Sequence, residues 1–200
     1  MFSIHHVTQC DRPAREALLD EVMGEARFTK TAARLRDNRL PAEGLSFIAR
    51  AKARVIGTVQ LWHVAAGPRR PALLLGPLAV ASDRRNRGIG TALMRRALVE
   101  ARRRGHGILL LVGDAPYYGR FGFSSQKTRA LWLPGPHERD RLLGRELTAG
   151  ALDGARGLVH ATGPLAPKPE LSTLAAELFA GLLPAADPRR SDVSFAPRAA

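Results

Sequence analysis

The sequence is poor in cysteine, in long apolar runs and in aromatic residues. Cys10 is the only cysteine among 200 residues, which excludes an internal disulfide and a zinc site built on several thiolates. His5 and His6 are adjacent in an expected strand and point to opposite faces, and we expect no metal site. No apolar run approaches about 18 residues, so no membrane span is expected. Because the N-terminus lacks a charged segment followed by an apolar stretch, we expect no signal peptide and a cytoplasmic location.

Acidic residues are also scarce relative to basic ones. The chain has 18 Asp and Glu against 31 Lys and Arg, which gives a formal net charge of +13. Such a charge is typical of proteins with an anionic partner: a nucleic acid, a membrane surface or a phosphorylated cofactor. The basic residues are spread along the chain, however, and aromatic residues that could stack on bases make up only 6% of it. The composition therefore disfavours a nucleic acid as the main partner.

One stretch of the sequence, residues 73–104, is strongly patterned. An apolar run at 73–81, broken by Gly76-Pro77, predicts a strand. After a polar loop, apolar residues recur every three or four positions over 88–104, which predicts a helix with one apolar face. The all-aliphatic run 108–112 predicts a second strand, buried on both faces. A strand, a helix and a strand in this order form a crossover unit whose two strands lie parallel.

The loop before this helix has the composition of an anion site. It reads Arg85-x-x-Gly88-x-Gly90, with Arg87 between. Glycines let backbone amides approach a ligand, and the first amides of a helix have no partner within it, so the loop suits a pyrophosphate. No Gly-Lys-Ser/Thr follows, which excludes the NTPase phosphate loop, and the third glycine of a dinucleotide fingerprint is missing. An ordinary strand-to-helix turn, with glycines for close packing, remains the alternative.

Two blocks of the sequence resemble a known family. Leu78-Ala79-Val80 followed by Arg85-x-x-Gly88-x-Gly90 resembles the acetyl-CoA signature of the GNAT superfamily of N-acetyltransferases. Further on, Tyr118 stands four residues before Gly122-Phe123, as a tyrosine typically does in that family. The combination is most similar to the YhbS-like predicted bacterial acetyltransferases. The resemblance covers residues 1–165 in outline and is sharp over 73–125.

The resemblance implies a fold, a co-substrate and an activity. The implied fold is α/β, or α+β in some schemes: a mixed, mostly antiparallel central sheet with one central, splayed parallel strand pair and helices on both faces. Acetyl-CoA is the implied co-substrate, and its acetyl group is implied to pass directly to a primary amine of an unidentified acceptor. Pantetheine is implied to enter the gap between the splayed strands. Gly76-Pro77 suits this idea because proline has no N–H to donate to the ladder.

The site residues are likewise implied by the resemblance. The implied cofactor-binding residues are Leu78, Ala79, Val80, Arg85, Asn86, Arg87, Gly88, Ile89, Gly90, Thr91 and Tyr117. The amide of Val80 is implied to donate to the oxyanion, and Tyr118 to be the catalytic acid that protonates the departing thiolate. A tyrosine with an ordinary pKa of about 10 is protonated at neutral pH and suits this role. The alternative is that both tyrosines only pack the short helix and contact CoA.

The general base is not evident from the sequence. Many members of the family have a glutamate on the organising strand, but the corresponding residues here, 73–77, include no carboxylate. His63, Glu43 and a water relay stay open as candidates, His63 because an imidazole titrates near neutral pH. The missing base also keeps a second function open: a module of the same fold that binds CoA or an acyl-CoA without turnover.

The remaining patterns divide the chain into a domain at 1–165 and an extension at 166–200. Within the domain they predict strands at 2–7, 45–50, 54–64, 130–133, 144–147 and 157–161, and a strand starting at Phe121-Gly122-Phe123. They also predict helices at 11–24, capped by Asp11, and at 28–37, and a short helix or turn at 115–119. The extension is expected to hold a Pro-rich linker, an amphipathic helix at 170–183 and a disordered tail at 184–200. The helix is expected to pack on the domain or on a second copy of the chain, as in a homodimer.

Overall fold

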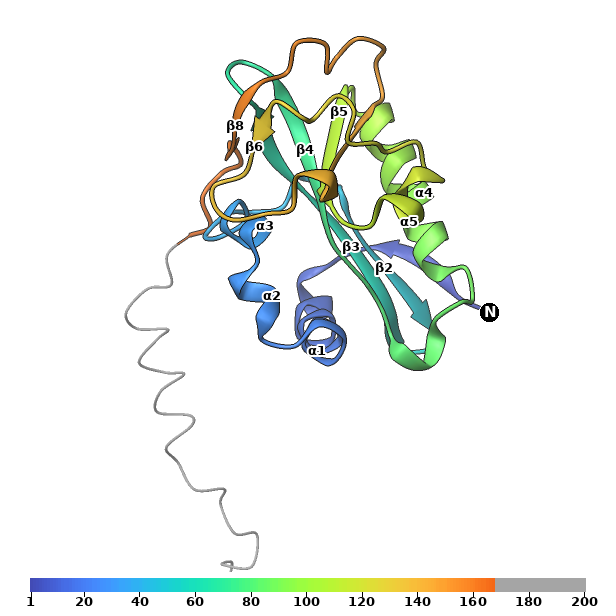
Figure 1. The fold of residues 1–200 in the computed structure, drawn as a ribbon. Coiled ribbons are helices and arrows are strands. Elements are labelled where there is room, and N and C mark those ends of the chain that lie inside the picture. Colours follow the sequence, from blue (N-terminus) through green and yellow to red (C-terminus); the bar gives the residue numbers. More distant parts are fainter. Residues whose placement is uncertain (168–200) are drawn as a thin grey trace, which may run out of the picture. The chain divides into compact units, whose positions relative to one another are not determined.

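The computed structural model describes residues 1–167, which form one sheet with helices packed against it (Figure 1). The strands are β1 (Ser3–His6), β2 (Ser46–Ala51), β3 (Arg54–Ala66), β4 (Pro71–Val80), β5 (Ile108–Val112), β6 (Leu131–Trp132), β7 (Leu142–Glu146) and β8 (Gly157–Ala161). The α-helices are α1 (Arg12–Met23), α2 (Ala26–Thr29), α3 (Thr31–Arg34), α4 (Ile89–Arg103) and α5 (Ala115–Gly119), with 3-10 turns at Gln9–Asp11, Ser82–Arg84 and Arg139–Arg141. None of the described helices is long and apolar enough to cross a lipid bilayer.

The sheet is mixed, mostly antiparallel, and contains the predicted parallel pair at its centre. Its main path runs β1-β2-β3-β4-β5-β7, and β8 pairs with both β3 and β6. Strands β4 and β5 are parallel but pair only at Leu73 with Leu109 and at Leu74 with Leu110. Beyond that point the two strands diverge, as the splayed pair requires. The short parallel pair of β6 and β8 is an addition that the sequence did not indicate.

Helices α1 and α4 cover opposite faces of the sheet. On one face, a Cβ added to Gly57 of β3 would lie 2.9 Å from Ile89 Cγ2 and 3.0 Å from Leu93 Cδ1. A side chain at Gly57 would therefore clash with α4, and the glycine permits the close approach of α4 to β3. Trp62 lies an odd number of residues after Gly57 in β3, so its side chain points to the other face of the sheet. There it lines a cavity together with Leu19 of α1. The fold class is therefore confirmed, and the close approach sets the N-terminus of α4 beside the end of β4.

Strand β4 carries one extra residue at Gly76-Pro77. Leu75 pairs with Leu61 of β3, and the next pair joins Leu78 to Val59, so three steps along β4 match two along β3. The indole Nε1 of Trp62 donates a hydrogen bond of 2.6 Å to the carbonyl oxygen of Gly76, which holds the bulge in place. The disturbance of the ladder expected from Gly76-Pro77 is confirmed, and it marks the start of the open edge of β4.

Three local predictions were wrong. Phe121-Gly122-Phe123 starts no strand, because Gly122 has φ of 77° and turns the chain while both phenylalanines are buried. The helix expected at 28–37 is two single turns, α2 and α3, separated by the extended residue Lys30. Asp11 does not cap α1 with its side chain. The predicted helix at 170–183 and tail at 184–200 lie outside the described residues.

Asp11 instead ties the start of α1 to strand β2. Its buried carboxylate accepts hydrogen bonds from the amide of Thr8 (2.7 Å) and the hydroxyl of Thr8 (2.8 Å), and it forms an ion pair with Arg50. These hydrogen bonds, with Arg50, outweigh the effect of burial and lower the pKa of Asp11 from 3.8 to about 2. The carboxylate is therefore charged throughout the neutral pH range, and it holds the turn at residues 8–11 against β2.

We expect Asp11→Ala to lower the free energy of unfolding by about 2 kcal/mol at neutral pH, because it removes a capping interaction and leaves Arg50 without its carboxylate. Since the folded-state pKa is depressed, the stabilisation is present above about pH 4 and disappears as the pH falls toward 2. Denaturant titrations at several pH values measure this. Asp140→Ala, which removes an exposed carboxylate, is the control and should change stability little. An equal loss for Asp11→Ala at pH 2 and pH 7 would contradict the assignment.

Candidate active site

The N-terminus of α4 forms an open cradle of backbone donors. Gly88 precedes the helix with φ of 76°, and the first helical hydrogen bond runs from the amide of Ala92 to the carbonyl of Gly88 (2.9 Å). The amides of Ile89, Gly90 and Thr91 therefore have no acceptor within the helix. They border a cavity of about 520 Å³, lined by Val80, Arg84, Arg85, Asn86, Gly88, Ile89, Gly90, Thr91, Tyr117 and Arg120. Free amides at a helix N-terminus favour an anion.

The charges around this cradle are positive. Arg84, Arg85 and Arg120 line the cavity, and the guanidinium of Arg120 lies over the ring of Tyr117, 4.2 Å from its centroid. Just before the loop that forms this cradle, the carboxylate of Asp83 pairs with Arg54 (2.9 Å) and Arg84 (3.2 Å). The carboxylate of Asp83 is thus already matched by two arginines, and the cavity keeps a positive charge that favours an anion.

Most of the residues predicted to bind the cofactor lie around this cradle. Leu78 lines a second cavity instead, Ala79 is buried in the sheet, and the exposed side chain of Arg87 lines neither cavity. Arg84 and Arg120 are the additions that sequence reasoning missed. Arg84 directly precedes the recognised loop, and Arg120 follows Tyr117 by three residues, so adjacency to both motifs was the available signal.

The two adjacent tyrosines serve different cavities. The hydroxyl of Tyr117 leans over the start of α4, where a Cβ added to Gly90 would lie 2.8 Å from it. Tyr118 lines the second cavity, and its ring packs so closely on Gly113 that an added Cβ there would lie 2.2 Å from Cε2. Burial, with smaller effects from Tyr117 and Asp114, raises the pKa of Tyr118 to about 12. The phenol is therefore fully protonated at neutral pH.

The open edge of β4 offers further backbone N–H donors. The amide of Ala81 donates to the carbonyl of Ile56 in β3 (3.0 Å). Because successive amides of a strand point to opposite edges, those of Leu78 and Val80 are directed away from β3. On that side β5 has already diverged, so the amides face the gap between the splayed strands.

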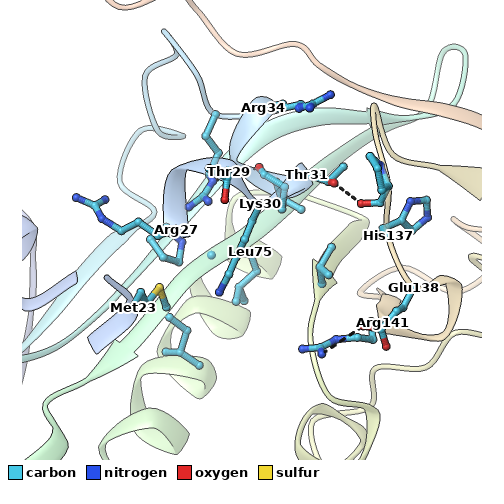
Figure 2. Close-up of a pocket in the computed structure, with 18 of the residues that line it drawn as sticks. Met23, Arg27, Thr29, Lys30, Thr31, Arg34, Leu75, His137, Glu138 and Arg141 are labelled. Atoms are coloured by element: carbon cyan, nitrogen blue, oxygen red, sulfur yellow. Dashed lines mark hydrogen bonds and ion pairs between the residues drawn. The ribbon is translucent and has the colours of Figure 1, made fainter. Parts of the chain in front are cut away.

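The second cavity has a volume of about 580 Å³ and lies beside this gap. It is lined by Met23, Arg27, Thr29, Lys30, Thr31, Ala32, Arg34, Arg36, Leu74, Leu75, Gly76, Pro77, Leu78, Val112, Tyr118, Pro136, His137, Glu138 and Arg141. Figure 2 shows Lys30 and Thr31 on one side, His137 and Glu138 on the other, and Leu75 of β4 below them. The hydroxyl of Thr31 donates to the carbonyl of Pro136 and joins the two walls.

The candidate bases named from the sequence do not meet Tyr118 here. His63 faces His106, with ring centroids 5.6 Å apart, and neither His63 nor Glu43 lines the two cavities described. Asp114 pairs with Arg141 (3.2 Å) at the cavity rim. Glu138 and His137 do line the cavity, but they lie in a loop without periodicity, so no sequence signal marked them.

Comparison with known proteins identifies the domain that carries these features. The family described as Acetyltransferase (GNAT) domain matches residues 42–125. The GNAT family N-acetyltransferase YhbS from Escherichia coli, solved in complex with CoA, superposes with a TM-score of 0.68 at 27% identity, covering 80% of this chain and 89% of that chain. The chain contains a GNAT acetyltransferase domain. A GNAT family acetyltransferase from Staphylococcus aureus Mu50 shares the fold with a TM-score of 0.51 at 15% identity, over 74% of this chain and 100% of that chain.

A further GNAT domain of similar size was solved with acetyl-CoA. It is an acetyltransferase from Brucella melitensis, 27% identical over 76% of this chain and 99% of that chain, with a TM-score of 0.48. A search of curated proteins gave no match. The match over residues 42–125 includes β4, the start of α4 and both tyrosines, which line the two cavities described above.

Proposed function

We propose that the protein transfers the acetyl group of acetyl-CoA directly to a primary amine. The observation that carries the proposal is the placement of two cavities on either side of the open end of β4. The cationic cradle reaches Val80 and Tyr117 from one side, and the second cavity reaches Leu78 and Tyr118 from the other. The likeness to the CoA-bound E. coli YhbS supports the choice of co-substrate.

In this arrangement the chain binds the diphosphate of acetyl-CoA through the amides of residues 89–91 and through Arg85 and Arg120. Pantetheine runs along the open edge of β4, which brings the thioester beside Tyr118. Holding the thioester and the amine together in this way lowers the entropic part of the barrier.

The reaction itself needs two donors. The neutral amine attacks the thioester carbonyl, and the amide of Val80 stabilises the resulting oxyanion, an effect on the order of 3 kcal/mol for one well-placed donor. The C–S bond then breaks, and the hydroxyl of Tyr118 gives its proton to the departing sulfur. The apolar surroundings that raise the pKa of Tyr118 also raise that of the thiol, so the proton transfer remains feasible.

One observation favours a second function, binding of CoA or an acyl-CoA without turnover. Strand β4 bears no carboxylate before Leu78, and the acidic group that does line the second cavity, Glu138, is exposed and lies 3.9 Å from the guanidinium of Arg141. Water or Glu138 must then take the proton of the amine for the first function to hold.

Two measurements separate these functions. Acetyl-CoA should raise the melting temperature of the protein, whereas adenosine, which lacks the diphosphate, should not, since binding to the folded state alone stabilises it. Release of free CoA thiol should then depend on an added primary amine. If acetyl-CoA raises the melting temperature but no amine of a broad panel causes thiol release, the second function, binding without turnover, replaces the first. No shift with acetyl-CoA would remove both functions.

A further inference from the structure

The second cavity continues into a third, and the two share a strongly positive wall. The third cavity, of about 430 Å³, lies between α1, α3 and β3 and shares Arg27, Arg34, Arg36 and Pro77 with the second. Together they are lined by seven cationic side chains, Arg12, Arg15, Arg27, Lys30, Arg34, Arg36 and Arg141, and by three carboxylates, Glu16, Asp37 and Glu138. The surplus of cations sits where the acceptor amine would have to enter.

The carboxylates of this wall are already engaged or exposed. Glu16 accepts from Arg15 (2.5 Å) and from Arg27 (2.8 Å), and Arg27 also pairs with Asp20 (2.8 Å). Asp37 is exposed, and Glu138 lies at Arg141. The Nε atom of Arg15 is buried and has no hydrogen-bond partner in the structure. The wall therefore holds a buried donor, Arg15 Nε, that no described residue satisfies.

Arg36 is a half-buried cation of this wall that has no carboxylate partner within residues 1–167. Its Nε donates to the carbonyl of Ala32 (3.3 Å), and it makes no ion pair within residues 1–167. Burial, and then the neighbouring Arg27, lower the pKa of Arg36 to about 10 despite the opposing attraction of Glu16, so Arg36 stays charged at neutral pH. A partly desolvated cation beside another cation is unfavourable on its own, and an anion bound against it removes that cost.

We propose that the acceptor is a small primary amine that also carries a carboxylate or phosphate group, and that Arg36, with Arg34 beside it, binds that anionic group. This inference rests on the proposed acetyl transfer. Arg36 lines the same cavity as Tyr118 and Leu78, so a molecule anchored at Arg36 presents its amine toward the open edge of β4. Polycationic amines are disfavoured, because they would bring further positive charge to this wall.

Matched pairs of amines test the inference. We compare lysine with cadaverine, which lacks the carboxylate, and phosphoethanolamine with ethanolamine, which lacks the phosphate. In at least one pair, the anionic member should be acetylated with a kcat/KM at least tenfold higher than that of the member without the anionic group. The pair that shows this difference indicates whether the bound group is a carboxylate or a phosphate. Arg36→Gln should raise the KM of the anionic amine about tenfold, with the KM of acetyl-CoA unchanged. Arg95→Gln, which removes an exposed charge from the middle of α4, is the matched control and should behave as the parent.

Calorimetric titration of the same amines into the CoA-bound protein gives a readout that needs no turnover. Tighter binding of an anionic member, lost in Arg36→Gln, supports the inference even if no amine is acetylated, in which case the proposed function alone fails. Equal binding within both pairs, or a preference that survives Arg36→Gln, overturns the inference. If the neutral amines are still acetylated at that point, the proposed function stands without it.

Discussion

Replacing Tyr118 by phenylalanine should lower kcat about 10²- to 10³-fold, which lies within the range expected when a general acid is removed. The substitution deletes only the hydroxyl. The ring keeps its packing against Gly113 and its edge contact with Phe123, whose centroid lies 6.2 Å away, so the cavity keeps its shape. The dissociation constant of acetyl-CoA should therefore stay the same, because the cradle at α4 does not include Tyr118.

Tyr117→Phe is the matched control for this change. It also removes one hydroxyl from a tyrosine, but from the one that leans over Gly90, so it should affect acetyl-CoA binding more than kcat. A group with a raised pKa acts as an acid at every pH below that value, so the parent enzyme should show no alkaline loss of kcat from Tyr118 below about pH 10. If Tyr118→Phe kept the kcat of the parent, solvent and not Tyr118 would protonate the departing thiolate, and Tyr118 would be only a packing residue.

The cradle and the strands around it could be predicted because their signals are local. Pairs of glycines, an apolar stripe at helical spacing and an all-aliphatic strand lie within residues 73–112, and β5 and α5 have the bounds that the sequence indicated. The bulge of β4 followed from Gly76-Pro77 alone, since a missing N–H must interrupt a ladder wherever it stands.

The individual side chains that line the second cavity could not be predicted, because the cavity is assembled from segments far apart in the chain. Its walls are α2 and α3 on one side and the loop at 134–141 on the other, held together by contacts such as Arg34 to the carbonyl of Pro134 (3.0 Å). Arg36, which no local sequence signal singles out, is partly buried by this assembly. His63 shows the converse: its chemistry suggested a base, but the alternation of β3 places it on the face of α4.

A valine at Gly90 should weaken acetyl-CoA binding at least 100-fold while leaving the fold intact. Gly90 is the second residue of α4 and has ordinary helical geometry, so the backbone accepts a side chain there. The new atoms would stand in the cavity between the hydroxyl of Tyr117 and Val80 Cγ2, which lie 2.8 Å and 3.6 Å from the position of an added Cβ. They would occupy the space over the free amides that the diphosphate needs, and the lost contacts are charge-assisted hydrogen bonds.

A truncated donor separates this effect from general damage. S-acetylpantetheine carries the thioester but lacks the diphosphate, so its kcat/KM should be nearly the same in the parent and in Gly90→Val. Gly119→Ala, where an added Cβ meets no atom within 4 Å, controls for the loss of a glycine and should bind acetyl-CoA normally. Equal losses with both donors would mean that the valine disturbs β4 and Tyr118 through packing. Unchanged acetyl-CoA binding in Gly90→Val would mean that the diphosphate does not bind at the start of α4. The thioester would then have no reason to lie beside Tyr118.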